Sequence, residues 1–424
     1  MKRLLIIAYY YPPLGMSGVK EPLPYVKYLH RFGWQPETLT VKPVSYYAYD
    51  KALERDYARF APVSRSGSAD PARLLHLLSG GRAKASLGSG GLRHGGLLSR
   101  LQHGLLIPDP KVLSVPFFYQ LGRKLGRGGR YDALLVIAPP FSHLRMAERL
   151  ATSLHLPWVA FMADRWVDGW VAKTTGLLSR PVAKRGERRA VDKARALLCA
   201  SPIEADDLRQ RYPAQAGKVL TAPLTFDPEK DATIGKQSRV PGRFLISMVG
   251  THRDDEGLPA VCRVLARLNR EHPDRNIVLR HVGSSIGQSF LEVAKKNGAG
   301  SIAEATGQVP YLESLRQQRE ADVLLLTVAD DNPHGLPGRT SDYVGAGRPI
   351  LLVASSEAPR RALGYFDIGA AFANDDEAGV YAVLKDALTG RGRLSQPISE
   401  AARSYFAAPT RAKQLADVLS TWTS

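Results

Sequence analysis

The start of the chain contains the feature that most limits its fold: a strand pattern, a glycine loop, a helix pattern and a second strand pattern in direct succession. The apolar run at residues 4–8 predicts a buried strand, and the loop after it contains Gly15 and Gly18. A helical pattern starts near Val19, and residues 34–41 predict the second strand. This order predicts a βαβ unit of a parallel sheet. A glycine loop that opens a helix also presents backbone N–H groups to a phosphate.

The spacing of these glycines differs from the GxGxxG fingerprint of dinucleotide-binding proteins. A tightly bound nicotinamide cofactor is therefore not the expected ligand. A nucleotide diphosphate held across a crevice fits the pattern better.

The length of 424 residues predicts two domains of about 200 residues each. Strand and helix patterns alternate through residues 1–226 and start afresh through 242–400, with a polar linker at 226–241 between them. Residues 401–424 predict a helix that packs back on the N-terminal domain. Alternation of this kind indicates an α/β protein with parallel sheets. We expect two Rossmann-like domains that face each other across a cleft, since ligands of such sheets bind outside the carboxyl ends of the strands.

Residues 65–105 form a basic insertion rich in Gly, Ser and Arg, which is typical of a mobile loop or lid. Short leucine-rich stretches flanked by arginines lie within it. They fit helices in a lipid headgroup layer or two ordinary helices packed on the domain, and the sequence leaves both interpretations open.

The net charge of +18 is concentrated in residues 1–130, which contain 20 Lys and Arg against 7 Asp and Glu. The rest of the chain has 38 against 33. A basic half indicates an anionic partner, either nucleic acid or membrane phospholipid, unless the whole source proteome is basic. Because no nucleic-acid module is present and the aromatic residues are not interleaved with the basic ones, we expect an anionic membrane surface and no nucleic acid.

The sequence also predicts where the protein is located. No apolar run is long enough to span a membrane. The apolar run at residues 4–8 precedes a Tyr- and Pro-rich segment where a signal-peptide cleavage site would lie, so it is interpreted as the first strand. Cys199 and Cys262 lie within apolar patterns and are expected to be buried thiols. The expected location is cytoplasmic, peripheral on the inner face of the cell membrane.

Several segments resemble, in the same order, the landmarks of a known family. They are YYYPPLGMSGV at 9–19, APPFSH at 138–143, Asp-Arg-Trp at 164–166, GQVPYLESL at 307–315 and LPGRTSDYVGAGRPI at 336–350. Over essentially its whole length the chain is similar to family 4 glycosyltransferases, which work in bacterial surface-polysaccharide synthesis. The resemblance implies a GT-B fold, without a metal or other cofactor. It also implies transfer of a hexose from a UDP- or GDP-type nucleotide-diphosphate sugar to a lipid-linked saccharide.

The resemblance implies a donor site built mainly by the C-terminal domain. The candidate donor-binding residues are Gly15, Gly18, Arg253, Val309, Pro310, Gly335, Leu336, Pro337, Gly338, Arg339 and Asp342. The residues themselves support part of this set, because a predicted helix begins near Arg339, where a guanidinium and a positive helix end suit a diphosphate. Asp342, one turn later, is placed to accept hydrogen bonds from ribose hydroxyls. The alternatives are an Arg339–Asp342 surface pair and, for Arg253, a loop neutralised by the acidic residues at 254–256.

The candidate catalytic residues are Asp164, Asp168, His143 and His334. The family has a Glu eight positions before the position of Asp342, and His334 stands there instead. This departure leaves retaining or inverting stereochemistry undecided. An inverting enzyme needs a general base, for which Asp164 and Asp168 are the candidates, with His143 behind them. Asp164 could instead cap a helix or pair with an arginine.

Two tryptophans of the same loop, Trp166 and Trp170, are candidate stacking faces for an acceptor sugar, with a core or lid role as the alternative. The leading hypothesis is thus an active hexosyltransferase. The alternative is a catalytically inactive sugar-nucleotide or polysaccharide-binding protein of the same fold.

Overall fold

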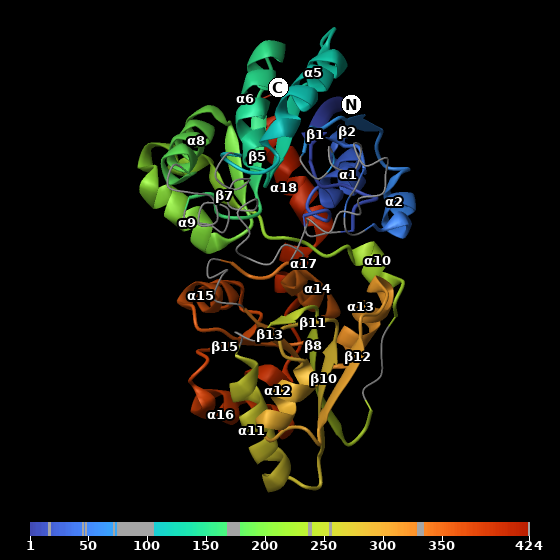
Figure 1. Cartoon of the computed structure of the whole chain (residues 1–424), viewed down its shortest axis with the longest axis vertical. Helices are drawn as coiled ribbons and strands as arrows, with labels where there is room; N and C mark the ends of the chain where they lie inside the picture. Colours follow the sequence, from blue (N-terminus) through green and yellow to red (C-terminus); the bar gives the residue numbers. More distant parts are fainter. Residues whose placement is uncertain are drawn as a thin grey trace. The chain divides into compact units, whose positions relative to one another are not determined.

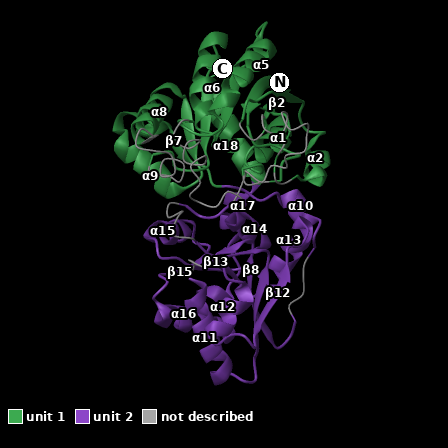
Figure 2. Cartoon of the chain, viewed as in Figure 1, with its two compact units in different colours: residues 1–223, 408–424 green, residues 224–407 purple. Residues whose placement is uncertain are grey.

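The computed structural model describes residues 1–15, 18–44, 46, 49–70, 73, 106–167, 179–235, 240–253, 257–328 and 335–422. The chain divides into two compact units (Figure 2). Unit 1 contains Met1–Pro223 and Ala408–Ser424, and unit 2 contains Leu224–Ala407. The chain therefore leaves unit 1 once and returns to it once.

Unit 1 is built on a seven-stranded sheet in the order β3-β2-β1-β4-β5-β6-β7, and every neighbouring pair is parallel. The strands are β1 (Lys2–Ile7), β2 (Trp34–Val41), β3 (Val63–Ser66), β4 (Ala133–Ala138), β5 (Trp158–Met162), β6 (Ala196–Cys199) and β7 (Val219–Thr221). The central strand β4 and residues 4–7 of β1 are apolar and buried, as expected for a parallel sheet covered on both faces.

The helices of unit 1 connect these strands (Figure 1). They are α1 (Leu23–Tyr28), α2 (Lys51–Tyr57), α5 (Val115–Gly126), α6 (Ser142–Leu154), α8 (Ser179–Lys193), α9 (Pro202–Arg211) and α18 (Ala408–Ser420), with 3-10 turns at Leu29–Phe32, Val112–Ser114 and Pro213–Lys218. Helix α5 packs on α6, and the last helix, α18, packs on α1. The C-terminal segment thus completes the apolar packing of unit 1.

Unit 2 contains a six-stranded parallel sheet in the order β12-β10-β8-β13-β14-β15 and a small parallel pair, β9 and β11. The strands are β8 (Arg243–Val249), β9 (His252–Arg253), β10 (Asn276–Val282), β11 (Ser285–Ile286), β12 (Ala303–Gly307), β13 (Val323–Thr327), β14 (Ile350–Val353) and β15 (Gly369–Phe372). The strand order reverses beside β8, which places β8 and β13 at the switch point where ligands of open α/β sheets bind.

The helices of unit 2 are α10 (Pro228–Ala232), α11 (Leu258–Glu271), α12 (Phe290–Lys296), α13 (Tyr311–Glu320), α14 (Arg339–Ala346), α15 (Glu357–Phe366), α16 (Glu377–Leu388) and α17 (Glu400–Phe406), with a 3-10 turn at Arg393–Ser395. Two separate apolar clusters lie in this unit. One contains the buried side of α11, and the other contains Tyr343 and Val344 of α14. Helix α14 is therefore fixed on the sheet by its own apolar residues.

The α/β class predicted from the sequence is confirmed, and β2 has the bounds predicted at 34–41. Both cysteines are buried free thiols, as predicted. The first helix begins at Leu23, with Pro22 at its N-cap position, and not near Val19. The stretch at 226–241 was predicted to be a linker, but it contains α10, capped by Asp227, and belongs to unit 2. Most of the insertion predicted at 65–105 lies outside the described residues.

Candidate functional site

In unit 2, the loops after β8 and β10 meet at the carboxyl edge of the sheet. Gly250 and Gly283 have φ angles of 114° and 151°. A Cβ atom on Gly283 would lie 2.1 Å from the carbonyl oxygen of Gly250, so a side chain there would collide with the backbone. His281 Nε2 lies 2.9 Å from the same oxygen. These contacts hold the ends of β8 and β10 close together, next to the switch point between β8 and β13. We call this pair of residues the glycine corner (Gly250 and Gly283).

Arg339, the first residue of α14, lies beside the glycine corner. Its guanidinium donates hydrogen bonds to the carbonyl oxygens of Thr327, at 2.7 Å, and Thr251, at 3.2 Å. Its Nη1 lies 3.1 Å from the position that a Cβ atom on Gly250 would occupy. The guanidinium is therefore fixed by backbone acceptors, with its positive charge at the N-terminal end of a helix. An anion bound there would be stabilised by both.

Asp342 lies one helical turn after Arg339 and is 7% exposed. Its Oδ1 accepts a hydrogen bond of 2.8 Å from the hydroxyl of Tyr311, the first residue of α13. The Nζ atom of Lys230 lies 5.3 Å from the Tyr311 ring. Tyr311 therefore fixes the orientation of the Asp342 carboxylate, which is what a group that recognises hydroxyls requires.

The other candidate donor-binding residues of unit 2 also follow the carboxyl ends of strands. Arg253 is exposed and pairs with β11 after β8, while Val309 and Pro310 follow β12. Val309 is partly buried against the same apolar cluster as Leu336. Gly338 is exposed and occupies the N-cap position of α14.

The loop before α14 leads directly into this helix. Gly335, Leu336 and Pro337 are partly buried, and the carbonyl of Pro337 accepts a hydrogen bond from the N–H of Thr340. His334 and the acidic residues 254–256 lie outside the described residues. The structure thus brings Arg253, Val309, the 335–338 loop and α14 to one edge of one sheet.

In unit 1, the glycine loop follows β1 at the carboxyl edge of the other sheet. A Cβ atom on Gly15 would lie 3.1 Å from the backbone of Tyr49, and Gly18 has a φ of 90°. A Cβ atom on Gly18 would lie 3.2 Å from the Tyr10 ring and 3.5 Å from Oε2 of Glu21. Gly15 and Gly18 therefore lie close to neighbouring residues, and the carboxyl group of Glu21 lies next to Gly18.

Glu21 is a functional candidate that the sequence analysis did not identify. Its Oε2 atom is buried and has no hydrogen-bond partner within the described part of the chain. Burial, together with the nearby charge of Asp164, raises the pKa of Glu21 to about 8. The only sequence signal for this residue is its position directly after the glycine loop.

Asp164 follows β5 at the same edge of the sheet. Its side chain is exposed, yet the surrounding protein atoms desolvate the carboxyl group and raise its pKa above the usual value. The charge of Asp164 also contributes to the raised pKa of the buried Glu204 in α9. The adjacent Arg165 pairs with Asp207. Glu21, Asp164 and Glu204 thus form a group of carboxyl groups with raised pKa values in unit 1.

Two predicted site residues of unit 1 are buried instead. Trp166 is 3% exposed and stacks on Phe141, with ring centroids 5.0 Å apart. The edge of its six-membered ring lies against Gly186, where a Cβ atom would lie 2.3 Å from the ring. Trp166 therefore belongs to the core, and the expectation that it offers a stacking face to an acceptor sugar is corrected.

His143 is fully buried at the start of α6. Its Nε2 lies 2.9 Å from the hydroxyl of Ser114, and its ring packs on Phe118, with centroids 4.5 Å apart. Burial lowers the pKa of His143 to about 3, so the ring is neutral. The expectation that it supports catalysis as a base is corrected in favour of a structural role. Asp168 and Trp170 lie outside the described residues.

Solved structures of other proteins have the same fold over almost the whole chain. The HepE protein of Anabaena in complex with UDP superposes with a TM-score of 0.63 at 13% identity, covering 99% of this chain and 100% of that one. Sucrose-phosphate synthase from Thermosynechococcus elongatus gives a TM-score of 0.61 at 13% identity, covering 99% of each chain. The lipopolysaccharide outer core galactosyltransferase WaaB gives 0.58 at 12% identity, also covering 99% of each.

The chain therefore has the GT-B fold, as the sequence resemblance implied. Sequence identities this low show the fold and not the reaction. No protein-family model matches the chain, and no curated protein matches it in sequence.

Proposed function

We propose that this protein is a glycosyltransferase that transfers a hexose from a UDP- or GDP-type sugar to a lipid-linked saccharide in bacterial surface-polysaccharide synthesis. The observation that carries this proposal is the arrangement at the carboxyl edge of the unit 2 sheet. There the start of α14 lies beside the glycine corner. The guanidinium of Arg339 is held by backbone carbonyl oxygens, and the carboxylate of Asp342 is oriented by Tyr311.

This arrangement matches the chemistry of a nucleotide diphosphate. The diphosphate is the leaving group, and its developing charge would be stabilised by Arg339 and by the N-terminal end of α14. Asp342 would accept hydrogen bonds from the ribose hydroxyls, and Val309 with Pro310 would contact the base through the backbone. HepE, which has the same fold, was crystallised with UDP and with UDP-glucose.

In the proposed mechanism, the backbone N–H groups at the start of α14 and the Arg339 guanidinium stabilise the leaving diphosphate. Arg253 and the backbone of Gly15 and Gly18 would add further contacts to the phosphates.

The carboxyl groups of unit 1 are proposed to act on the acceptor. Asp164 is solvent-accessible and has a raised pKa, which suits a group that takes a proton from an attacking hydroxyl. Whether the product retains or inverts the anomeric configuration decides whether such a base acts directly. NMR of the product's anomeric proton gives this answer.

The binding of the donor is tested by thermal unfolding with UDP, GDP and their sugars. A matching nucleotide is expected to raise the unfolding temperature, because a ligand that binds only the folded state stabilises it. Asp342→Ala is expected to abolish this rise. Asp375→Ala, which removes an exposed carboxylate from the same unit, is expected to leave it unchanged. A chain that responds to no nucleotide would refute the proposal, and nucleotide binding without transfer or donor hydrolysis would favour an inactive binding protein.

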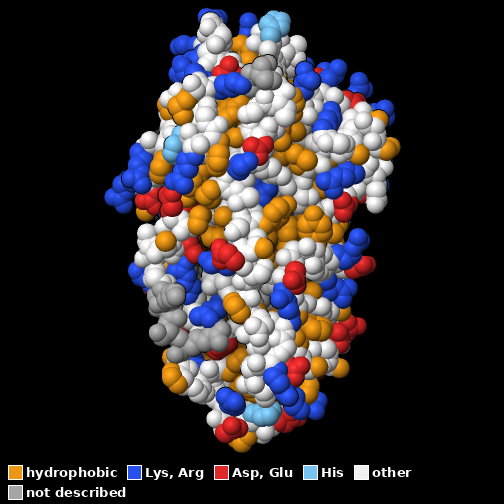
Figure 3. All heavy atoms as spheres, turned by 180° about the vertical axis from the view of Figure 1, so that it is seen from behind, with side chains coloured by type: hydrophobic (Ala, Val, Ile, Leu, Met, Phe, Trp, Pro, Cys, Tyr) orange, Lys and Arg blue, Asp and Glu red, His pale blue; other side chains and the backbone are white. Residues whose placement is uncertain are grey.

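The proposed acceptor is lipid-linked, so the protein is proposed to work at an anionic membrane surface. Lys and Arg side chains are numerous on the face drawn in Figure 3. Helix α5 has Arg123 and Lys124 in its last turn, and Phe117 of the same helix is 42% exposed. Within the residues that the structure covers, no helix combines the length and apolarity needed to cross a bilayer. Peripheral binding through charge is the mode that these features support.

A further inference from the structure

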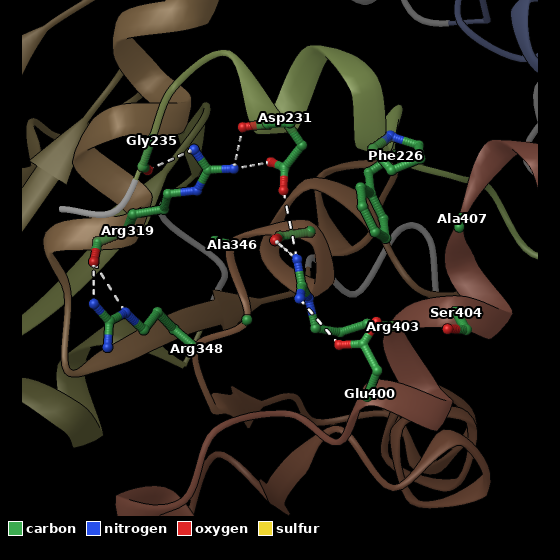
Figure 4. Close-up of a pocket in the computed structure, with 14 residues that line it drawn as sticks. Phe226, Asp231, Gly235, Arg319, Ala346, Arg348, Glu400, Arg403, Ser404 and Ala407 are labelled. Carbon is green, nitrogen blue, oxygen red and sulfur yellow. Dashed lines mark hydrogen bonds and ion pairs between the residues drawn. The ribbon is translucent and has the colours of Figure 1, made fainter.

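Unit 2 contains a cavity of about 660 Å³ (Figure 4). It is lined by residues of α10, α13, α14 and α17 and by the segments next to α10, α14 and α17. The charged lining residues are Arg319, Arg348, Arg403, Asp231 and Glu400. The volume lies within the usual range for sites that bind small molecules.

The cavity lies away from the candidate donor site. Arg339 and Asp342 are in the first turn of α14, whereas Gly345, Ala346 and Gly347 at the C-terminal end of this helix line the cavity. In a parallel sheet with connecting helices, the C-terminal ends of the helices lie at the edge of the sheet where the strands begin. The donor does not require a cavity at this edge, so the cavity needs another explanation.

The carboxylates in the lining are already paired with arginines. Asp231 pairs with Arg319, and its other oxygen lies 3.5 Å from Arg403. Glu400 lies 3.2 Å from Arg403. The dashed lines in Figure 4 link Arg319, Asp231, Arg403 and Glu400 into one chain of contacts. The third arginine, Arg348, donates two hydrogen bonds to the carbonyl oxygen of Arg319. Three guanidiniums against two carboxylates leave the lining with a positive balance.

One donor in this lining has no partner. The Nε atom of Arg403 is buried and makes no hydrogen bond to any residue that the structure describes. The remaining wall is apolar or lacks side chains: it includes the Phe226 ring and the backbone of Gly345 and Gly347. A ligand that fits this wall has an anionic group for the guanidiniums and a compact body for the rest of the volume.

We propose that this cavity is a second ligand site, which binds a small phosphate-bearing molecule independently of the nucleotide sugar. Phe226 and Ala407, which both line the cavity, form a parallel bridge. A bound phosphate ester would contact α10, α13, α14 and α17 of unit 2 at the same time.

The test is thermal unfolding of the full chain with glucose 6-phosphate, glycerol 3-phosphate and inorganic phosphate, at constant ionic strength. Glucose and sodium sulfate serve as the uncharged and the simple-anion controls. At saturating concentration one of the phosphate esters is expected to raise the unfolding temperature by at least about 3 °C. The ester that does so shows whether the part of the ligand that carries the phosphate is a sugar or a glycerol, as in lipid headgroups.

Two variants connect this rise to the cavity. Ala232→Glu places a carboxylate on an exposed lining residue of α10 without removing an arginine, and Arg348→Gln removes one guanidinium. Both are expected to reduce the affinity for the ester at least tenfold. Ala401→Glu, at an exposed position of α17 outside the lining, is the matched control and is expected to bind normally.

Asp342→Ala separates this inference from the proposed function, because it is expected to remove the response to nucleotides and to keep the response to the ester. The inference is overturned by a chain that responds to none of the esters. It is also overturned if sulfate raises the unfolding temperature as much as the ester does. Equal responses of Ala232→Glu and Ala401→Glu to the ester would overturn it as well.

Discussion

Glu21 is a carboxyl group whose chemistry departs far from that of an ordinary surface carboxylate. Its pKa is raised to about 8 by burial and by the charge of Asp164. Between pH 4.5 and 8 the folded chain therefore keeps a proton on Glu21 that the unfolded chain has lost. Stability is expected to fall as the pH rises through this window, because the unfolded state binds fewer protons there.

Glu21→Gln is expected to remove this dependence, because the amide stays neutral at every pH. At pH 8.5 the variant should be more stable than the natural protein, by roughly 2 kcal/mol after allowance for partial solvent exposure. At pH 5 the two should differ little. Urea unfolding at both pH values measures the difference.

Asp192→Asn is the control for Glu21→Gln. Asp192 is exposed on α8 of the same unit, and its contact with Arg188 is 3.9 Å long. Such an exposed pair contributes little to stability, so this variant should follow the natural protein at both pH values. Equal effects of the two substitutions would show that Glu21 is solvated like an ordinary carboxylate.

The glycine corner is the feature of unit 2 that fixes how two neighbouring strands end. Gly283→Ala would place a methyl group 2.1 Å from the carbonyl oxygen of Gly250, at a φ of 151°. The backbone of two strands would have to separate, so a loss of stability above about 3 kcal/mol is expected. Thermal unfolding and the response to nucleotide measure it.

Gly307→Ala distinguishes collision from backbone strain. Gly307 at the end of β12 has a φ of 71°, and nothing lies within 4 Å of the position of a Cβ atom. This variant has only the cost of a left-handed backbone, about 1 kcal/mol. If the two alanine variants lose the same free energy of unfolding, the close approach of Gly283 to Gly250 contributes nothing to the loss in Gly283→Ala.

The sequence predicted the elements whose ends depend on local signals. The strand predicted at 34–41 has the bounds of β2, and α14 begins at Arg339, where a helix was predicted to begin. Gly33, with a φ of 81°, ends the turn before β2, and Gly347, with a φ of 72°, ends α14. By contrast, α10 was predicted to be part of a linker. Its buried Asp231 pairs with Arg319, which is far away in the sequence, so no local pattern shows that this segment belongs to a folded unit.

The candidate site was predicted from sequence only where one segment contains it. Arg339 and Asp342 lie in one helix, so their spacing alone places them together. Trp166 is covered by Phe141 and Gly186, which belong to other elements, and no local pattern shows that its ring is buried. The electrostatic coupling of Glu21 to Asp164 likewise depends on how β1 and β5 are arranged in the sheet.

The charge of the whole molecule leads to the last prediction, which concerns binding to membranes. With a net charge of +18, the protein is expected to bind vesicles that contain anionic phospholipid and to be released as salt screens the attraction. Co-sedimentation with vesicles over a salt series measures this. The concentration of charge in residues 1–130 indicates unit 1 as the contact. Arg123→Glu with Lys124→Glu in α5 is therefore expected to reduce binding at least tenfold, at about 1 kcal/mol or more for each basic residue.

A charge-matched control decides between a contact surface and the net charge alone. Lys295→Glu with Lys296→Glu changes the net charge by the same amount, in the last turn of α12 of unit 2. If α5 contacts the membrane, this pair should weaken binding much less than the α5 pair, because it changes the net charge without removing a contact residue. Equal losses from the two double variants would mean that only net charge matters, and α5 would then have no special role at the membrane.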